Sequence, residues 1–319
     1  MNKTNQNLPL VSICIPSYNH EKYIAETISS VILQDYQNIE LLIIDDASFD
    51  NSDAIINDFL SKYKSHFVRF DYHKNLTNQG ISYNLNYAIN WAKGKYFYAI
   101  ASDDILMPFK TSLLVSEIEK LDDSYAAIFG DALFINENSQ EILVNKNLQL
   151  LMPEEANKYK KENVYKTFLE LYSYLHNKNY LADDFQVKYS SFFYGNYLPA
   201  MSSLIKLNCI KNVGAYTNGN RIEDLEMWLK LTQKYSIKLL KNPVAYYRFH
   251  NNNSSRVMQQ EMLKDELAVI NSQKQFAMSN GLSNEFLGKI CWLIREIYPK
   301  DPKTAQYYAD INGIKLTKK

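Results

Sequence analysis

The sequence is poor in cysteine and has no excess of charge of either sign. Its 35 basic and 35 acidic residues give a formal net charge of zero, whereas a surface that binds nucleic acid needs an excess of positive charge. We therefore expect no nucleic-acid partner. The three cysteines, Cys14, Cys209 and Cys291, are too widely spaced to suggest a metal cluster. Their odd number, in a chain without a signal-peptide pattern, predicts reduced thiols and a cytoplasmic protein.

Long apolar runs and glycine-rich phosphate motifs are also missing. The longest apolar runs, such as 39–44, are far shorter than the roughly twenty residues that a membrane-spanning helix needs. No G-x-G-x-x-G follows the first predicted strand, and G-x-x-x-x-G-K-[ST] occurs nowhere. The usual motifs of dinucleotide redox enzymes and P-loop enzymes are therefore absent. Any phosphate must be held in another way.

The first 130 residues instead alternate short apolar strands with amphipathic helical patterns. This alternation is typical of a mostly parallel sheet covered by helices, an α/β fold. Strands are predicted at 10–15, 39–45, 67–72, 95–101 and 125–129, and helices at 21–33, 52–63, 81–92 and 108–121.

The pattern changes after Asp131, where 136–139 predicts a turn between two short strands. We expect the tyrosine-rich segment 152–189 to be helical, and we expect substrate specificity to lie in 152–200. Further elements are predicted as an ordered segment at 201–206, a helix at 223–235, strands at 237–240 and 244–248, and helices from 258 to about 308. The chain thus divides into a main domain, 1–256, and a helical C-terminal extension, 257–319.

Polar residues follow three of the predicted strands, at the carboxyl ends where ligands bind in open parallel sheets. These segments are Pro16-Ser17-Tyr18-Asn19-His20, Asp45-Asp46-Ala47-Ser48 and Ser102-Asp103-Asp104. Carboxylates can accept hydrogen bonds from a nucleobase or ribose, and carboxylate oxygens also suit Mg2+ or Mn2+ bound together with substrate phosphates. Each segment taken alone could equally be an ordinary turn, a helix cap or a solvated loop.

Two clusters lie further along the chain. Glu223-Asp224-Leu225-Glu226 opens a helix in which Asp224 and Trp228 are four positions apart and share a face. Partial burial beside this apolar stripe would raise the pKa of Asp224 and make it a better base, whereas Glu226 is expected to be solvated. The alternative is that these carboxylates only interact with the helix dipole. The second cluster, 246–256, gathers Arg248, which matches diphosphate oxygens, and His250, which can ligate a metal.

These motifs occur together and in a characteristic order. They are 11–19, 45–48, Asn78-Gln79-Gly80, 102–104, 223–224 and 248–250. As a set they resemble family 2 glycosyltransferases of the GT-A fold, a group rich in bacterial capsule, lipooligosaccharide and O-antigen enzymes. The resemblance extends over about residues 8–256. It implies a Rossmann-like sheet with a nucleotide-sugar-binding half, 8–130, and an acceptor-binding and catalytic half, 131–256.

The resemblance also implies roles for individual residues. Asp45 would read the base and Asp104 would anchor a divalent cation with His250 as a further contact, while Asp224 would be the general base. The remaining nucleotide-sugar contacts that it implies are Pro16, Tyr18, Asn19, Asn78, Gly80, Ser102, Asp103 and Arg248. The family often has Asp-x-Asp-Asp at the fourth strand, and Ala101 stands at the first of these positions, which weakens the expectation of tight metal binding.

The expected reaction is an inverting transfer from a nucleotide diphosphate sugar, expected to be UDP-linked, to a hydroxyl of a bacterial surface glycan or lipid-linked oligosaccharide, with Mn2+ or Mg2+. Two alternatives stay open. A sugar nucleotidyltransferase would need a glycine-rich basic loop where this chain has 16–19, and Ala101 gives slight support to a non-catalytic nucleotide-sugar binder.

Peripheral membrane association is a further expectation from the C-terminal region. The residues that suggest an interfacial face are Trp292, Ile294, Arg295, Ile297, Tyr298, Lys300 and Lys303. Ordinary helix packing is the alternative explanation of the same pattern. The expected location is the cytoplasm, at the inner face of the membrane.

Overall fold

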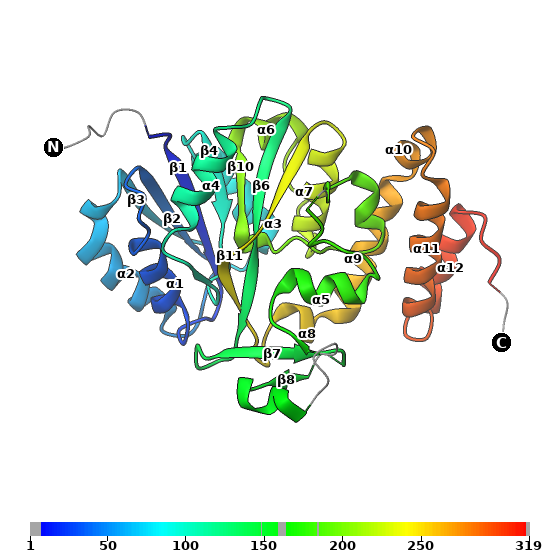
Figure 1. The fold of residues 1–319 in the computed structure, drawn as a ribbon, viewed down its shortest axis with the longest axis horizontal. Helices are drawn as coiled ribbons and strands as arrows, with labels where there is room; N and C mark the ends of the chain where they lie inside the picture. Colours follow the sequence, from blue (N-terminus) through cyan, green and yellow to red (C-terminus); the bar gives the residue numbers. More distant parts are fainter. Residues whose placement is uncertain (1–7, 148, 159–163, 184, 317–319) are drawn as a thin grey trace.

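The fold is built around one mixed sheet that crosses the middle of the molecule (Figure 1). The computed structural model describes residues 8–147, 149–158, 164–183 and 185–316. The strand order is β3-β2-β1-β4-β10-β6-β11-β5. The strands are β1 (Val11–Ser17), β2 (Ile39–Asp45), β3 (Arg69–Lys74), β4 (Tyr96–Ala99), β5 (Ile105–Leu106), β6 (Tyr125–Ile135), β10 (Ser203–Lys206) and β11 (Ser236–Arg248). Strands β3, β2, β1 and β4 are parallel, β10 is antiparallel to β4 and β6, and β11 is parallel to β6. The predicted α/β class with a mostly parallel central sheet is confirmed.

Helices cover both faces of this sheet. They are α1 (Ile24–Ile32), α2 (Ser52–Tyr63), α3 (Ile81–Trp91), α4 (Lys110–Ile118), α6 (Leu207–Val213) and α7 (Glu223–Thr232). Successive residues of β1 and β2 point to opposite faces, so Ile13 and Leu41 pack in the cluster with α1, α2 and α4, while Cys14 and Leu42 pack with α3, α6 and α7. Because both faces are buried, these strands have nearly continuous apolar sequences, as expected for a parallel sheet.

The pair β6 and β11 is longer and more regular than predicted. Strand β6 continues to Ile135, directly before the predicted turn, and β7 (Glu141–Asn145) follows the turn antiparallel to it. Strand β11 is a single element where the sequence predicts two, and its register against β6 shifts on both sides of Pro243. Proline has no N–H for the ladder, so an irregularity is expected there.

The helical prediction for 152–189 is confirmed only in its middle. In the described part of this segment the α-helix is α5 (Phe168–Leu175), which begins with a capping box between Thr167 and Glu170. The other elements are a 3-10 helix at Pro153–Lys158 and the short strand β9 (Val164–Tyr165), which pairs with β7 as does β8 (Leu150–Leu151). Residues 159–163 and 184 lie outside the described chain. Aromatic packing, with the rings of Tyr180 and Tyr197 stacked at 3.9 Å, replaces helical periodicity as the organising force near 180–197.

The C-terminal region is helical, as predicted, and packs against the main core. Its helices are α8 (Ser254–Val257), α9 (Gln259–Ser272), α10 (Lys274–Ser279), α11 (Ser283–Ile297) and α12 (Pro302–Ile311). Leu293 of α11 belongs to the same buried cluster as Trp228 and Leu229 of α7. No helix in the described residues combines the length and the hydropathy needed to cross a bilayer.

The residues of α11 expected to form a membrane-facing surface do not share one exposed face. Ile294 and Ile297 are buried in the core cluster, whereas Trp292 and Tyr298 are partly exposed. The pattern of the segment therefore reflects an amphipathic helix that packs with its isoleucines on the protein, and the expectation of a membrane-facing stripe that includes them is wrong.

The shared core generates a stability prediction. Leu293→Ala should lower the free energy of unfolding by about 2–5 kcal/mol, the usual cost of truncating a fully buried leucine, and urea unfolding followed by circular dichroism should give one transition for the whole chain. Arg295→Ala, at a side chain that is 72% exposed, is the control and should change the stability by less than about 0.5 kcal/mol. Two separate transitions, with only the weaker one affected by Leu293→Ala, would mean that the C-terminal helices form an independent unit.

Candidate functional site

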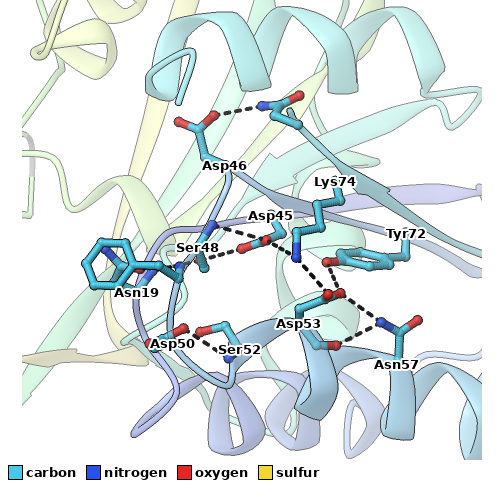
Figure 2. Close-up of polar contacts among 12 residues, drawn as sticks. Asn19, Asp45, Asp46, Ser48, Asp50, Ser52, Asp53, Asn57, Tyr72 and Lys74 are labelled. Carbon is cyan, nitrogen blue, oxygen red and sulfur yellow. Dashed lines mark hydrogen bonds and ion pairs between the residues drawn. The ribbon is translucent and has the colours of Figure 1, made fainter. Parts of the chain in front are cut away.

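The loops that follow β1 and β2 lie side by side because these strands pair in register, with Ser17 opposite Asp45. The N–H of Asn19 donates to the Ser48 hydroxyl at 2.9 Å, and the N–H of Phe49 donates to the Asn19 carboxamide at 3.0 Å (Figure 2). The structure thus brings together the first two polar segments singled out in the sequence. Asn19 has φ of 53°, a left-handed conformation that asparagine tolerates better than most residues.

Asp45 lies at the base of these loops and is fully buried. Its carboxylate accepts from the hydroxyl of Ser48 and from the N–H of Ser48 at 3.3 Å, and the Lys74 ammonium lies 3.9 Å away. Burial raises the pKa of Asp45 even though these partners act in the opposite direction. Pro16 in β1 is partly exposed, and Tyr18, 43% exposed, meets Phe49 edge to face at 6.3 Å. The exposed aromatic surface of these loops suits a flat heterocycle.

Asp46 holds the neighbouring 75–80 loop in place. The sequence alone does not show which of Asp45 and Asp46 has this role. Its carboxylate accepts from the Asn75 side chain at 2.7 Å and from the N–H groups of Gln79 and Gly80 at 2.8 and 2.9 Å. Gly80 has φ of 81°, which favours glycine, and its N–H is occupied by this bond. Asn78 at the tip of the same loop is exposed. Asp46 therefore fixes the 75–80 segment next to the end of β2.

Three side chains from separate segments converge at the carboxyl ends of β1, β4 and β11. His20, Asp103 and His250 each offer one ligand atom, and these atoms lie within 4.8 Å of one another. The Nε2 of His250 is 2.8 Å from Oδ2 of Asp103, and Nδ1 of His20 is 2.7 Å from the Ser102 hydroxyl. A nitrogen and carboxylate set of this kind can hold a divalent cation. His20 is a candidate ligand that sequence reasoning missed, although the pairing of β1 with β4 is the signal that could have found it.

The hydrogen bonds around this group fix the resting tautomer of His250. The N–H of Asn252 donates to Nδ1 of His250 at 3.2 Å, so the proton of neutral His250 sits on Nε2 and faces Oδ2 of Asp103. Ligation of a metal through Nε2 would therefore require this proton to move to Nδ1. Burial lowers the pKa of His20. Burial acts to raise the pKa of Asp103, but the hydrogen bond from His250 and the charge of His20 hold it below its usual value. Neutral imidazole and ionised carboxylate are the forms that bind metal.

Asp104 and Arg248 lie behind this group and hold it in place. Oδ1 of Asp104 accepts from the backbone N–H of Arg248 at 2.9 Å, and the side chain is buried. Burial and the neighbouring Asp103 raise the pKa of Asp104 well above its usual value. The sequence predicts that Asp104 lies next to His250. In the structure it is Asp103 that contacts His250, because the Asp104 side chain points inward and contacts the end of β11.

Arg248 is fully buried, and each of its three side-chain nitrogens donates a hydrogen bond. The acceptors are the Asp103 carbonyl at 2.6 Å, the Asn136 carbonyl at 3.2 Å, the Ser139 hydroxyl at 2.8 Å and the Glu26 carboxylate at 2.5 Å. The guanidinium is thus engaged within the protein rather than presented at the surface. It joins α1, the 102–104 loop and the 136–139 turn.

Asp224 lies at the start of α7, in the wall of a cavity of about 1320 Å³. Oδ2 accepts from the Asn196 amide at 2.6 Å and Oδ1 from the N–H of Leu225 at 2.7 Å. Burial raises the pKa of Asp224, as the argument from the helix face predicts. Asn196 was not identified from the sequence, because it comes from the irregular segment before β10.

The prediction that Glu226 is solvated is wrong. Glu226 is 6% exposed and accepts from the Thr217 hydroxyl at 2.5 Å and the Asn220 amide at 2.8 Å, with the Lys230 ammonium at 2.7 Å. The loop before α7 folds back over the helix, and helical spacing alone does not reveal this contact.

Comparison with known proteins gives consistent matches. A family model described as glycosyl transferase family 2 matches residues 12–184. An uncharacterized glycosyltransferase of Rickettsia typhi is 26% identical over 294 residues, which cover 90% of this chain and 80% of that protein. One of Rickettsia felis is 36% identical over 134 residues, 42% of this chain, and this match spans only 21% of the relative's length.

Solved structures share the fold at low identity. TarS of S. aureus in complex with UDP-GlcNAc superposes with a TM-score of 0.65 at 15% identity, covering 95% of this chain and 80% of that one. The mannosyltransferase PcManGT from Pyrobaculum calidifontis, in complex with GDP-Man and Mn2+, superposes with a TM-score of 0.60 at 12% identity, covering 98% and 77%. These similarities show that the fold is GT-A.

The convergence of His20, Asp103 and His250 generates a metal-binding prediction. Asp103→Asn should weaken Mn2+ binding at least roughly tenfold, because a neutral amide replaces the anionic ligand; the loss of bound Mn2+ can be followed by electron paramagnetic resonance. Asp123→Asn, at a fully exposed carboxylate, is the matched control and should bind Mn2+ as the wild type does. If Asp104→Asn lost Mn2+ and Asp103→Asn kept it, the ligand would be Asp104.

Proposed function

This chain belongs to glycosyl transferase family 2, and from that premise we propose that it performs an inverting, metal-assisted transfer of a sugar from a nucleotide diphosphate sugar to an acceptor hydroxyl. The observation that carries the proposal is the group formed by His20, Asp103 and His250. It adjoins the aromatic and acidic loops after β1 and β2, where a nucleoside would bind, at the ligand-binding edge of the sheet.

The donor half is assigned to the loops at this edge. Tyr18 and Pro16 would cover the base while Asp45 accepts from a ring N–H, and Asn19 holds the two loops together. Asn78 and Gly80 would border the nucleotide on the other side. We favour uridine, whose N3–H can donate to Asp45, although the N1–H of guanine offers a similar donor. TarS binds UDP-GlcNAc and PcManGT binds GDP-Man, so the fold accommodates either base.

The diphosphate would lie over the metal-binding group. Asp103, His250 and His20 would hold Mn2+ or Mg2+, and Ser102 orients His20. A cation bound there would neutralise charge on the departing nucleotide diphosphate. Arg248 and Asp104 contribute by fixing the positions of His250 and Asp103, a positioning role that replaces the direct phosphate contact and metal contact expected from the sequence.

Asp224 is assigned as the general base. The acceptor oxygen forms a bond to the anomeric carbon as the bond from that carbon to the diphosphate oxygen breaks, and the hydroxyl proton passes to the Asp224 carboxylate. Attack from the side opposite the leaving nucleotide inverts the anomeric centre. The raised pKa of Asp224, caused by burial, makes the carboxylate more basic at the cost of a larger protonated fraction at low pH.

The biological setting is proposed from the resemblance to bacterial surface-glycan enzymes. We propose a surface glycan or a lipid-linked oligosaccharide as acceptor and action at the cytoplasmic side of the membrane; the three unpaired cysteines support a reducing location. The alternatives of a sugar nucleotidyltransferase and a non-catalytic binder have less support, because the relatives over most of the chain are described as glycosyltransferases.

The base assignment generates the prediction that Asp224→Asn lowers turnover at least roughly a hundredfold while donor binding is kept, since an amide cannot take the proton. Nucleotide release measures turnover, and calorimetry with UDP measures donor binding. Glu223→Gln, the adjacent carboxyl, is the matched variant. Near wild-type turnover in Asp224→Asn with loss in Glu223→Gln would move the base by one residue.

The donor assignment generates a second prediction. In the presence of Mn2+, UDP should bind more tightly than GDP, and Asp45→Asn should weaken UDP binding, because a neutral carboxamide accepts less strongly from the uracil N3–H than a carboxylate does. Isothermal titration calorimetry measures both affinities. GDP binding far tighter than UDP would contradict the uridine assignment and leave the metal-binding group unaffected.

A further inference from the structure

The cavity beside Asp224 is separate from the residues assigned to the donor. Its walls come from α5, the 193–201 segment, the start of α7, and the helices α9 and α11. None of His20, Asp45, Asp103 and His250 lines it. Asp224 lines this cavity of about 1320 Å³, which is built largely by the C-terminal half, and so does Phe249, the residue before His250.

The cavity wall is rich in aromatic side chains. Those that bear on the argument are Phe168, Tyr172, Tyr194, Tyr247, Phe249 and Trp292. Trp292 is 39% exposed, and the Lys289 ammonium lies 4.4 Å from its ring centroid. Lys289 in turn pairs with Glu266 at 2.6 Å, so the indole rests on a fixed support. Flat aromatic surface with a few placed polar groups suits a ligand that has both apolar faces and hydroxyl edges, such as a pyranose.

Asn196 supplies the polar group next to Asp224. Its amide nitrogen donates to Asp224, but its carbonyl oxygen Oδ1 is buried and has no hydrogen-bond partner among the described residues. An unmet buried acceptor costs about 1–3 kcal/mol, which a ligand hydroxyl would recover. The preceding Gly195 has φ of 146°, and a Cβ there would come within 2.5 Å of the His176 ring. Glycine at this position lets Asn196 approach Asp224.

We propose that this cavity binds the acceptor and that Asp224 and Asn196 together select a sugar with two neighbouring free hydroxyls. One hydroxyl gives its proton to Asp224 as it attacks the donor, and the adjacent one donates to Oδ1 of Asn196. The pyranose ring stacks on the aromatic wall, with Trp292 as the main platform. This inference rests on the proposed function, in which Asp224 is the base.

Asn196 also sets the basicity of Asp224. Its hydrogen bond holds the pKa of Asp224 down against the larger effect of burial. The other ionisable groups around Asp224 are Glu223 and Glu226 on α7, Tyr172 on α5, Tyr216 in the loop before α7, and Glu266 on α9, which Lys289 neutralises. Loss of Asn196 therefore raises the pKa of Asp224, and the acid limb of the pH dependence of transfer moves to higher pH.

The test uses p-nitrophenyl β-glycosides of glucose, galactose, mannose and N-acetylglucosamine as probes. Saturation-transfer NMR measures their binding to the full chain, with and without UDP and Mn2+. Trp292→Ala should weaken the binding of the glycoside with the highest affinity for the wild type about tenfold. Tyr307→Ala, at an exposed aromatic outside the cavity, should bind it as the wild type does. Equal affinities in these two variants would overturn the assignment of the cavity.

Monodeoxy analogues of the best probe test the two-hydroxyl recognition. Removal of either of two neighbouring hydroxyls should weaken binding to the wild type about tenfold. In Asn196→Ala, removal of one of these two hydroxyls should no longer weaken binding, while UDP should still bind. The role of Asn196 would be overturned if both deoxy analogues still bound Asn196→Ala more weakly than the parent glycoside. It would also be overturned if the acid limb of the pH dependence of transfer did not move in this variant. A wild-type chain that binds UDP but no glycoside would refute the cavity inference alone, and one that binds glycosides but no nucleotide would refute the proposed function alone.

Discussion

A buried guanidinium is the interaction on which the site depends. Arg248 is removed from water, and its charge must be met inside the protein, because an unpaired buried cation costs several kcal/mol. Its partners come from α1, the 102–104 loop and the 136–139 turn, segments far apart in the sequence. Meeting this requirement brings Asp103 next to His250, two residues beyond Arg248. The grouping of Asp103 with His250 is thus a consequence of how the charge of Arg248 is satisfied at the end of β11.

In two pairs of adjacent aspartates, Asp45 with Asp46 and Asp103 with Asp104, the two side chains have different contacts. Asp46 pins the 75–80 loop while Asp45 faces the nucleoside loops, and Asp104 holds the end of β11 while Asp103 meets His250. One member of each pair anchors a distant segment, and the other is the member to which we assign a ligand. The anchoring member accepts from backbone N–H groups, two at Asp46 and one at Asp104, and this fixes the position of its neighbour.

The sequence predicts the parts of this molecule that repeat a simple period. The strands β1 to β4 and the helices between them follow from apolar runs and 3.6-residue spacing, and the carboxyl edge follows from the parallel order. It does not predict contacts between distant loops. The choice between Asp103 and Asp104, the burial of Glu226, and the meeting of Asn196 with Asp224 all depend on chain segments whose own sequences have no period. Among the described residues of 152–189, the stretch that forms an α-helix is the one with a capping box, and aromatic packing organises the part near Tyr180.

The segments assigned to ligands also retain features that folding alone would disfavour. Ala47 adopts φ of 62°, a conformation that costs a residue with a Cβ roughly 1–2 kcal/mol, and the hydrogen bonds from Ser48 to Asp45 hold it there. Asn196 keeps a buried carbonyl without a partner among the described residues. Both lie in segments assigned to ligands, next to two large buried clusters that supply the stability to bear them. Because a sugar hydroxyl could donate to Oδ1 of Asn196, part of the binding energy of an acceptor would be the recovery of the cost of that buried acceptor.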